Sequence, residues 1–441
     1  IKRSDNLRIT GQITDNRHKV ATEFLKSECV METNAEWGKN GIITEAFPVY
    51  LDGVDDVSYY ECKVQNGATD AGYILVNINQ TDVLVPQYNT EGKAPSEDFA
   101  RESGIAVDNL QVFRYNWFEM LAEKKTSIGL GDGTPVIARG FGKNGEFQKK
   151  TKLDRQQILL ARNKFRQRVQ QAGGVNPIYL KQNVRQLHSR DSLVVETLKK
   201  YPQEGLAKSA AKTKWTSDEL NNTFSTGWHL PQWTQVRNTT NVLSGCGPLA
   251  LAMMYAYHRQ FTGKTKLFNG LDLNSNVPTP YGTYPASSTM GSYNQIIKDV
   301  AFQIGADCGA NYGASGTGVN INALENDGEL YGDRLGYDVH LDSDFGGDFT
   351  KGKTALGHIR GERPCMFQFD SDRNGSVDHY GAIEGVKYME RKYVWNWYNW
   401  EMWYLVNYGW GNTRQWICVD AQYSSNATEY KNTGNLYMEW R

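Results

Sequence analysis

The stretch SGCGPLALAMMYAYHRQ, residues 244–260, constrains the fold more than any other part of this 441-residue chain. It places Cys246 between two glycines and follows them with Pro248 and the apolar run Leu249 to Tyr257. Proline suits the first turn of a helix, because its missing N–H would have no partner there. A helix that is apolar on all sides must be buried. We therefore expect a core helix with Cys246 at its N-terminus.

Cys246 has the setting of a reactive thiol. At a helix N-terminus, the N–H groups that lack intrahelical partners and the macrodipole stabilise an anion. Such a site can lower a thiol pKa from about 8.5 to roughly 3.5–7.5, so that a thiolate exists at neutral pH. Gly245 and Gly247 leave room for another backbone, such as that of a substrate, to approach. The alternative is a small apolar cysteine that caps a core helix.

A thiolate nucleophile needs a proton partner, and the candidates are the seven histidines. His258 is excluded, because it lies about 18 Å along the same helix from Cys246. His379 opens the expected strand in VDHYGAIEGVKY, where small neighbours would let its ring project from the strand end into a cleft. We predict that His379 is the base. The remaining histidines are interpreted as structural: His18, His188, His229, His340 and His358.

Two side-chain amides complete the predicted site. Asn407, in YLVNYGWGN, can accept the Nδ1–H of an imidazole and hold its productive tautomer, with Trp410 as a shield from water. The alternative role of Asn407 is that of a hairpin residue beside core aromatics. Gln235, in LPQWTQV, and the backbone N–H of Cys246 would form a two-donor oxyanion hole, in which one donor can contribute about 10²–10³ in rate.

The N-terminal half has a different texture. Residues Gly72–Gly92 predict a β-hairpin, with strands Tyr73–Ile78 and Val83–Val85 on either side of a polar turn. Residues 111–125 carry apolar side chains at helical intervals and predict a helix. Residues 153–174 predict a polar surface helix that ends at a glycine pair.

A domain boundary is expected at residues 203–222. This segment is small, polar and lysine-bearing, which is the composition of an exposed linker open to proteolysis. We predict an N-terminal domain over residues 1–202 and a C-terminal domain over residues 223–441. The length of the chain agrees with two or three domains.

Composition limits the classes of partner. With Lys+Arg 48 against Asp+Glu 49, the chain has no overall field that would recruit nucleic acid or an acidic membrane. No apolar run reaches the roughly 18 residues of a membrane span. The six cysteines occur without C-x-x-C spacing, which argues against a zinc site and a dense disulfide framework. The sequence begins at Ile1 without methionine, which is compatible with removal of a signal peptide and export.

Taken together, these residues resemble the streptopain family of papain-like bacterial cysteine proteases. The family motifs are W-x-Q at 233–235, Ser-Gly-Cys at 244–246, H-x-x-x-x-x-G from 379, NYGWG at 407–411 and NYGASGTGVN at 311–320. The last two are similar to the family's NWGWG and to its YGxxGSG segment near the substrate cleft. The separation of Cys246 and His379 also falls within the interval of about 130–150 residues for papain-like enzymes. The cleft residues that the resemblance implies are Gly245, Gly313, Ser315, Gly316 and Trp410.

The resemblance implies an α+β fold, in which a helix carrying the cysteine packs on an antiparallel sheet carrying His379 and Asn407. A β-rich inhibitory propeptide, which the hairpin at 72–92 resembles, would precede this papain-like domain. The implied function is that of a secreted or periplasmic bacterial endopeptidase precursor, with protein or peptide substrates, its own propeptide as inhibitor and no cofactor. The chain departs from the family at four places: Gly247-Pro248, Asp378, Glu384 and Tyr408.

Three alternatives stay open. The chain could be a catalytically silent binding or surface-interaction protein on the same fold, or an enzyme that transfers the acyl group to an amine instead of water. The third is a calcium site, because DSDRNGSVD at 370–378 places oxygen ligands at EF-hand positions. Gly381 stands where that loop needs its bidentate glutamate, which favours a tight polar turn without a metal.

Overall fold

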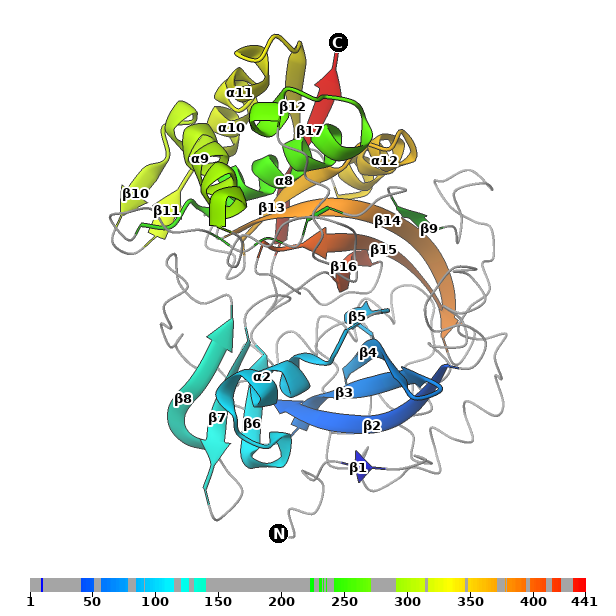
Figure 1. Cartoon of the computed structure of the whole chain (residues 1–441). Coiled ribbons are helices and arrows are strands. Elements are labelled where there is room, and N and C mark those ends of the chain that lie inside the picture. Colours follow the sequence, from blue (N-terminus) through cyan, green and yellow to red (C-terminus); the bar gives the residue numbers. More distant parts are fainter. Residues whose placement is uncertain are drawn as a thin grey trace.

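The structure, a computed structural model, is an α+β protein built on one large mixed sheet. The strands of the N-terminal half, coloured blue and cyan, lie at one end of the molecule, and most helices lie at the other (Figure 1). The α+β prediction is confirmed at this level. The structure describes residues 9–10, 41–50, 57–77, 85–90, 92–114, 120–126, 131–139, 223–225, 230–231, 233, 235, 242–270, 291–313, 316–345, 348–370, 377, 379–393, 397–409, 415–421 and 431–441.

The N-terminal unit, which we define as the described residues before 140, is rich in strands, as predicted. Its strands pair antiparallel, except that β2 also pairs parallel with β6. Helix α2 buries Phe99 in a core that β2, β3 and β6 line. The elements are β1 (Ile9–Thr10), β2 (Gly41–Tyr50), β3 (Val57–Asn66), β4 (Thr69–Asn77), β5 (Gln87–Asn89), α2 (Pro95–Ser103), β6 (Leu110–Arg114), β7 (Met120–Lys125) and β8 (Gly131–Arg139).

The hairpin predicted over residues 72–92 forms between β4 and β5, where Ile74 lies opposite Tyr88. Its second strand is Gln87–Asn89, later in the chain than the predicted Val83–Val85. Val85 is described and lies outside any strand. The pairing is therefore as predicted, and only the position of the second strand differs.

The helix predicted over residues 111–125 is wrong. This segment contributes to β6 and β7, which pair with each other antiparallel. Alternate side chains of both strands belong to one core, as side chains on one face of a sheet do. These side chains are those of Leu110, Val112, Met120 and Ala122. The surface helix predicted at 153–174 and the linker at 203–222 lie outside the described residues.

The C-terminal unit, the described residues from 223 onward, combines helices with long antiparallel strands. The strand order β12-β17-β13-β14-β15-β16 forms its part of the sheet. The elements are β9 (Thr223–Ser225), α8 (Cys246–Phe261), α9 (Gly291–Asp307), β10 (Asn311–Gly313), β11 (Gly316–Gly318), α10 (Ile321–Asp327), α11 (Leu330–Asp333), β12 (Val339–Asp344), α12 (Asp348–Arg360), β13 (Cys365–Asp370), β14 (His379–Tyr393), β15 (Trp397–Asn407), β16 (Gln415–Ala421) and β17 (Lys431–Trp440).

This sheet has a helix on each face. On one side, which we call the α8 face, helix α8 packs in a core with Tyr380 and Ala382 of β14. On the other side, the α12 face, helix α12 packs with Phe369 of β13 and Ile383 of β14. Neighbouring residues of β14 therefore contribute to different cores, as the alternation of side chains along a strand requires.

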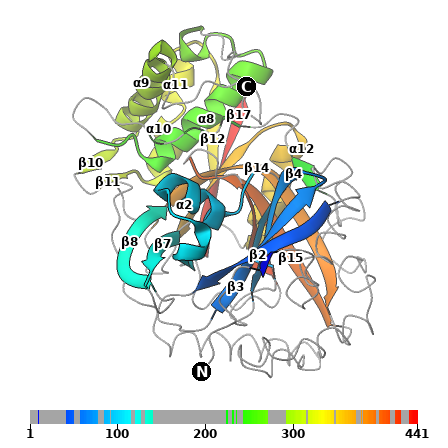
Figure 2. The ribbon, with the colours of Figure 1, turned by 60° about the horizontal axis from the view of Figure 1, so that its bottom comes forward.

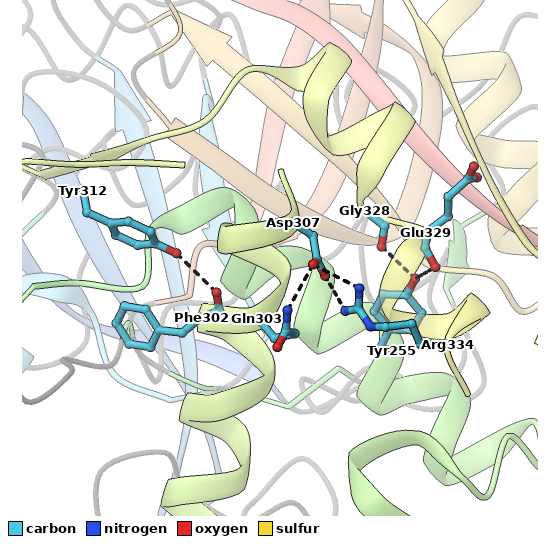
Figure 3. A network of polar contacts seen from close by, with 8 residues as sticks. All are labelled: Tyr255, Phe302, Gln303, Asp307, Tyr312, Gly328, Glu329 and Arg334. Atoms are coloured by element: carbon cyan, nitrogen blue, oxygen red, sulfur yellow. Dashed lines mark hydrogen bonds and ion pairs between the residues drawn. The ribbon is translucent and has the colours of Figure 1, made fainter. Parts of the chain in front are cut away.

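Helix α8 is buried along its apolar run, as the sequence predicts. Polar contacts join it to the elements around it (Figure 3). The Tyr255 hydroxyl donates to the carbonyl of Gly328 at 2.9 Å, next to α11. Near the end of α9, Asp307 accepts hydrogen bonds from Gln303 at 3.0 Å and from Arg334 at 3.0 Å. These contacts hold α9 and the α10–α11 segment around α8.

The two units join in one sheet through β5 and β16. Trp416 lies opposite Tyr88 and Ile417 opposite Gln87, and the Cys418 N–H donates to the Pro86 carbonyl at 3.0 Å. Figure 2 brings the N-terminal strands forward and shows β2 to β4 in front of β14 and β15. Side chains from both units share one core, in which Trp403 and Leu405 of β15 pack with residues of β2, β3 and β4.

No helix among the described residues is long and apolar enough to cross a membrane. The five described cysteines form no disulfide bond: Cys62, Cys246, Cys308, Cys365 and Cys418. Cys29 lies outside the described residues.

Candidate functional site

The candidate nucleophile, Cys246, is the first residue of α8, as predicted. Gly245 before it has φ +92, and a Cβ there would lie 3.0 Å from Cγ2 of Thr317. Both the backbone conformation and the space thus favour glycine. The Thr317 hydroxyl donates to the Leu243 carbonyl at 2.5 Å, which joins β11 to the turn before the helix. The turn that presents Cys246 is therefore fixed from outside the helix.

The residue after the cysteine is equally confined. A Cβ on Gly247 would lie 2.7 Å from Cγ1 of Val319 and 3.2 Å from Cδ2 of Tyr380. The Tyr380 hydroxyl donates to the Val319 carbonyl at 2.9 Å. Gly247 and the residues around it are buried, whereas Cys246 is partly exposed. The thiol thus lies at the surface of a turn that is otherwise closely packed.

A hollow of about 540 Å³ lies beside this turn. Val319 and Tyr380, which confine Gly247, also line the hollow. The rest of its wall comes from residues 320–322 at the start of α10 and from Phe345, Gln368 and Val377. Its wall therefore combines apolar side chains, the Tyr380 ring and three side-chain amides, those of Asn320, Asn322 and Gln368.

His379 is the first residue of β14, and its ring is buried. The ring centroid lies 5.5 Å from that of Phe369 and 6.0 Å from that of Tyr408, both members of the α12-face core. The Nε2 atom lies 2.9 Å from the Tyr408 carbonyl, which can only accept, so Nε2 carries a proton. The prediction that this ring projects into a cleft is wrong for this conformation.

Burial lowers the pKa of His379 to about 3, and the hydrogen bond to the Tyr408 carbonyl opposes this change only in part. The ring is therefore neutral at neutral pH. Its neighbour Tyr380 contributes to the α8-face core that Cys246 packs against, so the side chains of residues 379 and 380 leave β14 on opposite sides. In this conformation the ring of His379 and the thiol of Cys246 belong to different faces of the sheet.

The two predicted amides lie on the α8 side of the sheet. Asn407, the last residue of β15, accepts the Gly409 N–H at 3.0 Å through Oδ1 and donates to the Pro231 carbonyl at 3.0 Å through Nδ2. The Gln235 N–H donates to the Gly409 carbonyl at 3.2 Å. Asn407 and Gln235 are therefore brought together through Gly409.

Two side chains near the site were not predicted from the sequence. Tyr380 lies beside both Cys246 and Cys308, and burial raises its pKa, with the two thiols adding to the effect. Burial likewise raises the pKa of Cys308 to about 12. Thr317 is the second, through its contacts with the turn at Gly245. The alternation of residues along β14 could have indicated Tyr380, and Thr317 lies within the motif at 311–320 that the resemblance places near the cleft.

Several predicted residues cannot be placed. Ser315, Asp378 and Trp410 lie outside the described residues, and so does most of the loop considered for calcium. Gly313 and Gly316 pair with each other at the end of the β10–β11 hairpin. Among the residues that the structure describes, no group of three or more histidine, cysteine or acidic side chains could hold a metal ion.

No protein-family model matches the chain, and a search of curated proteins finds no match either. Among solved structures, the chain is similar to the active wild-type interpain A cysteine protease of Prevotella intermedia. That match has a TM-score of 0.34 and 14% identity, over 51% of this chain and 98% of that chain. A mutant prointerpain A fragment from the same organism matches with a TM-score of 0.40 and 10% identity, over 88% of this chain and 96% of that one.

Proposed function

We propose that the chain is the precursor of a cysteine endopeptidase, captured in a latent conformation. The observation that carries the proposal is the Cys246 turn. A partly exposed thiol begins a buried helix, and the glycines on either side have no room for a larger side chain. A helix N-terminus favours the thiolate form. Export to the periplasm or the cell exterior, expected from the resemblance to the streptopain family, belongs to the same proposal.

In the active form, the Cys246 thiolate attacks a peptide carbonyl, and the Cys246 N–H and the Gln235 amide stabilise the oxyanion. The imidazolium of His379 gives its proton to the leaving amine, and Asn407 orients the ring. Water, deprotonated by the neutral His379, then releases the acyl group and restores the thiolate. The hollow beside Val319 and Tyr380 would take a substrate side chain.

The position of His379 supports latency. A neutral, buried ring on the α12 face cannot form an ion pair with a thiolate on the α8 face. His379 is the first residue of β14, and the pairing of β14 with β15 begins only at Ala382. Turning the ring toward Cys246 would therefore break the terminal pair with Phe369 and leave the β14–β15 ladder intact.

The N-terminal unit contacts the chain close to the point that holds His379. The Gln415 side chain accepts hydrogen bonds from Tyr73 at 2.9 Å and from Gln87 at 2.7 Å. Gln415 lies a short stretch of chain after Tyr408. The carbonyl of Tyr408 accepts the hydrogen bond from the His379 ring. We expect cleavage within residues 203–222 to weaken these contacts and to free the ring.

The test is a peptidase assay on the intact chain and on the chain cleaved within residues 203–222. We expect at least about a hundredfold higher activity after cleavage, and its loss in Cys246→Ala. Full activity of cleaved Cys246→Ala would exclude Cys246 as nucleophile. Equal activity of the intact and cleaved wild-type chains would exclude latency.

A silent binding protein on the same fold is the second candidate. The observation that favours it is the burial of His379 against Phe369 and Tyr408, away from the thiol. Alkylation of the cleaved chain by iodoacetamide at about pH 6 separates the two. If the chain is an enzyme, Cys246 should react much faster than the other cysteines. If it is a silent binding protein, all cysteines should react slowly and at similar rates.

A further inference from the structure

The strand pairing that joins the two units is short. Within the described part of the chain, the strands of the N-terminal unit join those of the C-terminal unit only where β5 pairs with β16. That pairing comprises Trp416 opposite Tyr88 and Ile417 opposite Gln87. Without β5, the edge of β16 would expose its backbone N–H and carbonyl groups, which readily take up another extended segment.

Tyr88 is the centre of this junction. It is fully buried, and its ring lies 5.4 Å from that of Trp403 at 64° and 6.2 Å from that of Trp416 at 13°. Edge-to-face and offset-stacked pairs of this kind add stability beyond the area that they bury. Two tryptophans of the C-terminal unit thus enclose one tyrosine of the N-terminal unit.

A buried cation completes this enclosure. The Lys387 ammonium of β14 lies 4.8 Å from the centroid of the Tyr88 ring and 4.7 Å from that of the Trp416 ring. It also donates a hydrogen bond to the Tyr88 hydroxyl. Lys387 is fully buried, and a buried ammonium is costly unless polar or aromatic groups surround it. Tyr88 supplies the hydroxyl that accepts this hydrogen bond, and Trp416 supplies a ring face to Lys387.

Amide groups fix the residue next to the anchor. Gln87 donates to Gln415 at 2.7 Å and to the Tyr73 hydroxyl at 2.6 Å, and that hydroxyl donates to Gln415 at 2.9 Å. This triangle sets the register in which Tyr88 faces Lys387. Backbone pairing, an aromatic anchor and an amide contact therefore converge on Gln87 and Tyr88 of β5.

We infer that the edge of β16, together with Trp403, Trp416 and Lys387, is a strand-addition site for an extended segment with a central tyrosine. Its occupant in this chain is β5, and Tyr88 is the anchor through which the N-terminal unit stays attached to the C-terminal unit. A few aromatic anchors usually supply most of the free energy of such an interface. The inference rests on the proposed function only in so far as this attachment maintains latency.

Cys418 reports directly on this site. It lies on β16, its side chain packs in the same core as Tyr88, and its N–H donates to Pro86 just before β5. Cys365 on β13 is fully buried in the α12-face core and serves as the internal reference, whereas Cys62 on β3 belongs to the shared core and reports on its N-terminal side. Release of β5 would expose Cys418 while Cys365 stays protected, and loss of the C-terminal fold would also expose Cys365.

The experiment measures alkylation rates of the three thiols by mass spectrometry in the full chain carrying Cys246→Ala. That background excludes self-cleavage, so the result does not depend on the proposed function. Tyr88→Ala is expected to raise the Cys418 rate by about tenfold and by more than the Cys62 rate, with the Cys365 rate changed by less than about twofold. The matched control is Tyr60→Ala, which removes an equally buried tyrosine of the same core on β3, away from β16. It is expected to raise the Cys62 rate at least as much as the Cys418 rate.

An unchanged Cys418 rate in Tyr88→Ala, or a parallel rise of all three thiols, would overturn the inference. If Tyr88→Ala does not fold, Tyr88→Leu and Tyr88→Phe decide the question, because both keep an apolar side chain and only phenylalanine keeps a ring between Trp403 and Trp416. We expect the Cys418 rate to be at least about threefold higher in Tyr88→Leu than in Tyr88→Phe. Equal Cys418 rates in these two variants would show that the ring between the two tryptophans does not anchor the strand.

Discussion

The Cys246 turn and the His379 pocket lie at the starts of neighbouring elements, and they differ in almost every physical respect. Cys246 is partly exposed at a helix N-terminus, and glycines and the side chains of Thr317 and Val319 hold its turn from outside. His379 is buried between aromatic rings, and its Nε2–H is bound to a backbone carbonyl. One region favours a charged side chain, and the other excludes it.

This difference teaches that a candidate nucleophile can be in place while its base is not. The turn at Cys246 depends on packing within the C-terminal unit, which would survive cleavage of the chain. The pocket of His379 depends on the Tyr408 carbonyl, and the chain beyond Tyr408 contacts the N-terminal unit at Gln415. Variants that act on only one of the two regions should therefore have separable effects.

The largest effect is expected from removal of the base. His379→Ala should lower kcat/KM of the cleaved chain by about 10³ or more, because the thiolate loses its proton partner. In the intact chain the same change should alter the weak residual activity little. His340→Ala, at a partly exposed histidine of β12, is the matched control and should retain full activity. A loss of less than about tenfold in cleaved His379→Ala would exclude His379 as the base.

A methyl group tests how tightly the nucleophile turn is packed. Gly247→Ala would place a Cβ 2.7 Å from Val319, so we expect the free energy of unfolding to fall by about 1–3 kcal/mol. Gly357→Ala is the control, since a Cβ there meets nothing within 4 Å in the interior of α12. It should raise the free energy of unfolding by about 0.5–1 kcal/mol. Urea unfolding measures both changes. If both variants change the free energy of unfolding in the same direction, the described packing is contradicted.

A buried carboxyl makes the N-terminal unit sensitive to pH. Burial, with smaller contributions from Glu97 and Asp98, raises the pKa of Glu61 from 4.5 to about 7, and the hydrogen bond from Ser96 opposes this. Because the pKa is raised on folding, the stabilisation is complete below about pH 4.5 and is lost as the pH rises through about 7.

Glu61→Gln keeps an acceptor for the Ser96 N–H and removes the charge. We expect it to raise the free energy of unfolding by roughly 1–3 kcal/mol at pH 8 and to change it little at pH 4. Urea unfolding at the two pH values measures the difference. An equal effect at both would show that Glu61 does not titrate in this range. If the N-terminal unit holds His379 in its pocket, the intact wild-type chain should also have higher peptidase activity at pH 8 than the intact variant.

The smallest effect is expected at Tyr380. Tyr380→Phe leaves the Val319 carbonyl without its donor beside Gly247, at a cost of about 1 kcal/mol in the free energy of unfolding. The Cys246 alkylation rate should also rise by about twofold to threefold. The control is Tyr257→Phe, because Tyr257 lies in α8 well beyond Cys246 and its hydroxyl donates to Glu362. This variant should leave the Cys246 alkylation rate unchanged. If Cys246 is alkylated at the same rate in both variants, Tyr380 does not support the turn.

Sequence patterns predicted those parts of the site that short stretches of chain determine. The proline and the apolar run predicted α8 with Cys246 at its start, and small neighbours placed His379 at the start of a strand. The sequence does not predict which face of the sheet each side chain occupies. Glu384 lies in a bulge between Ile383 and Gly385. The alternation of side chains between the two faces of the sheet is therefore interrupted at this residue. Its carboxylate accepts the Leu230 N–H at 2.6 Å, a long-range contact that no local pattern reveals.

The failed prediction over residues 111–125 has a related cause. Apolar side chains at helical spacing predict one helix, whereas β6 gains partners from both β2 and β7. Pairing between distant segments outweighed the local pattern. The junction at Tyr88 could not be predicted for the same reason, because Lys387 and Trp416 reach it from strands about 300 residues later in the sequence.

The most direct test of the central claim is a pH titration of the His379 imidazole by NMR, in the intact and the cleaved chain. We predict that the intact chain shows no titration of this ring between about pH 5 and 8, because its pKa is lowered to about 3. After cleavage within residues 203–222, the ring should titrate at about 6.5 or above, as an imidazole beside a thiolate does. A ring that titrates identically in both forms would contradict the claim that the base is withheld until the chain is cut.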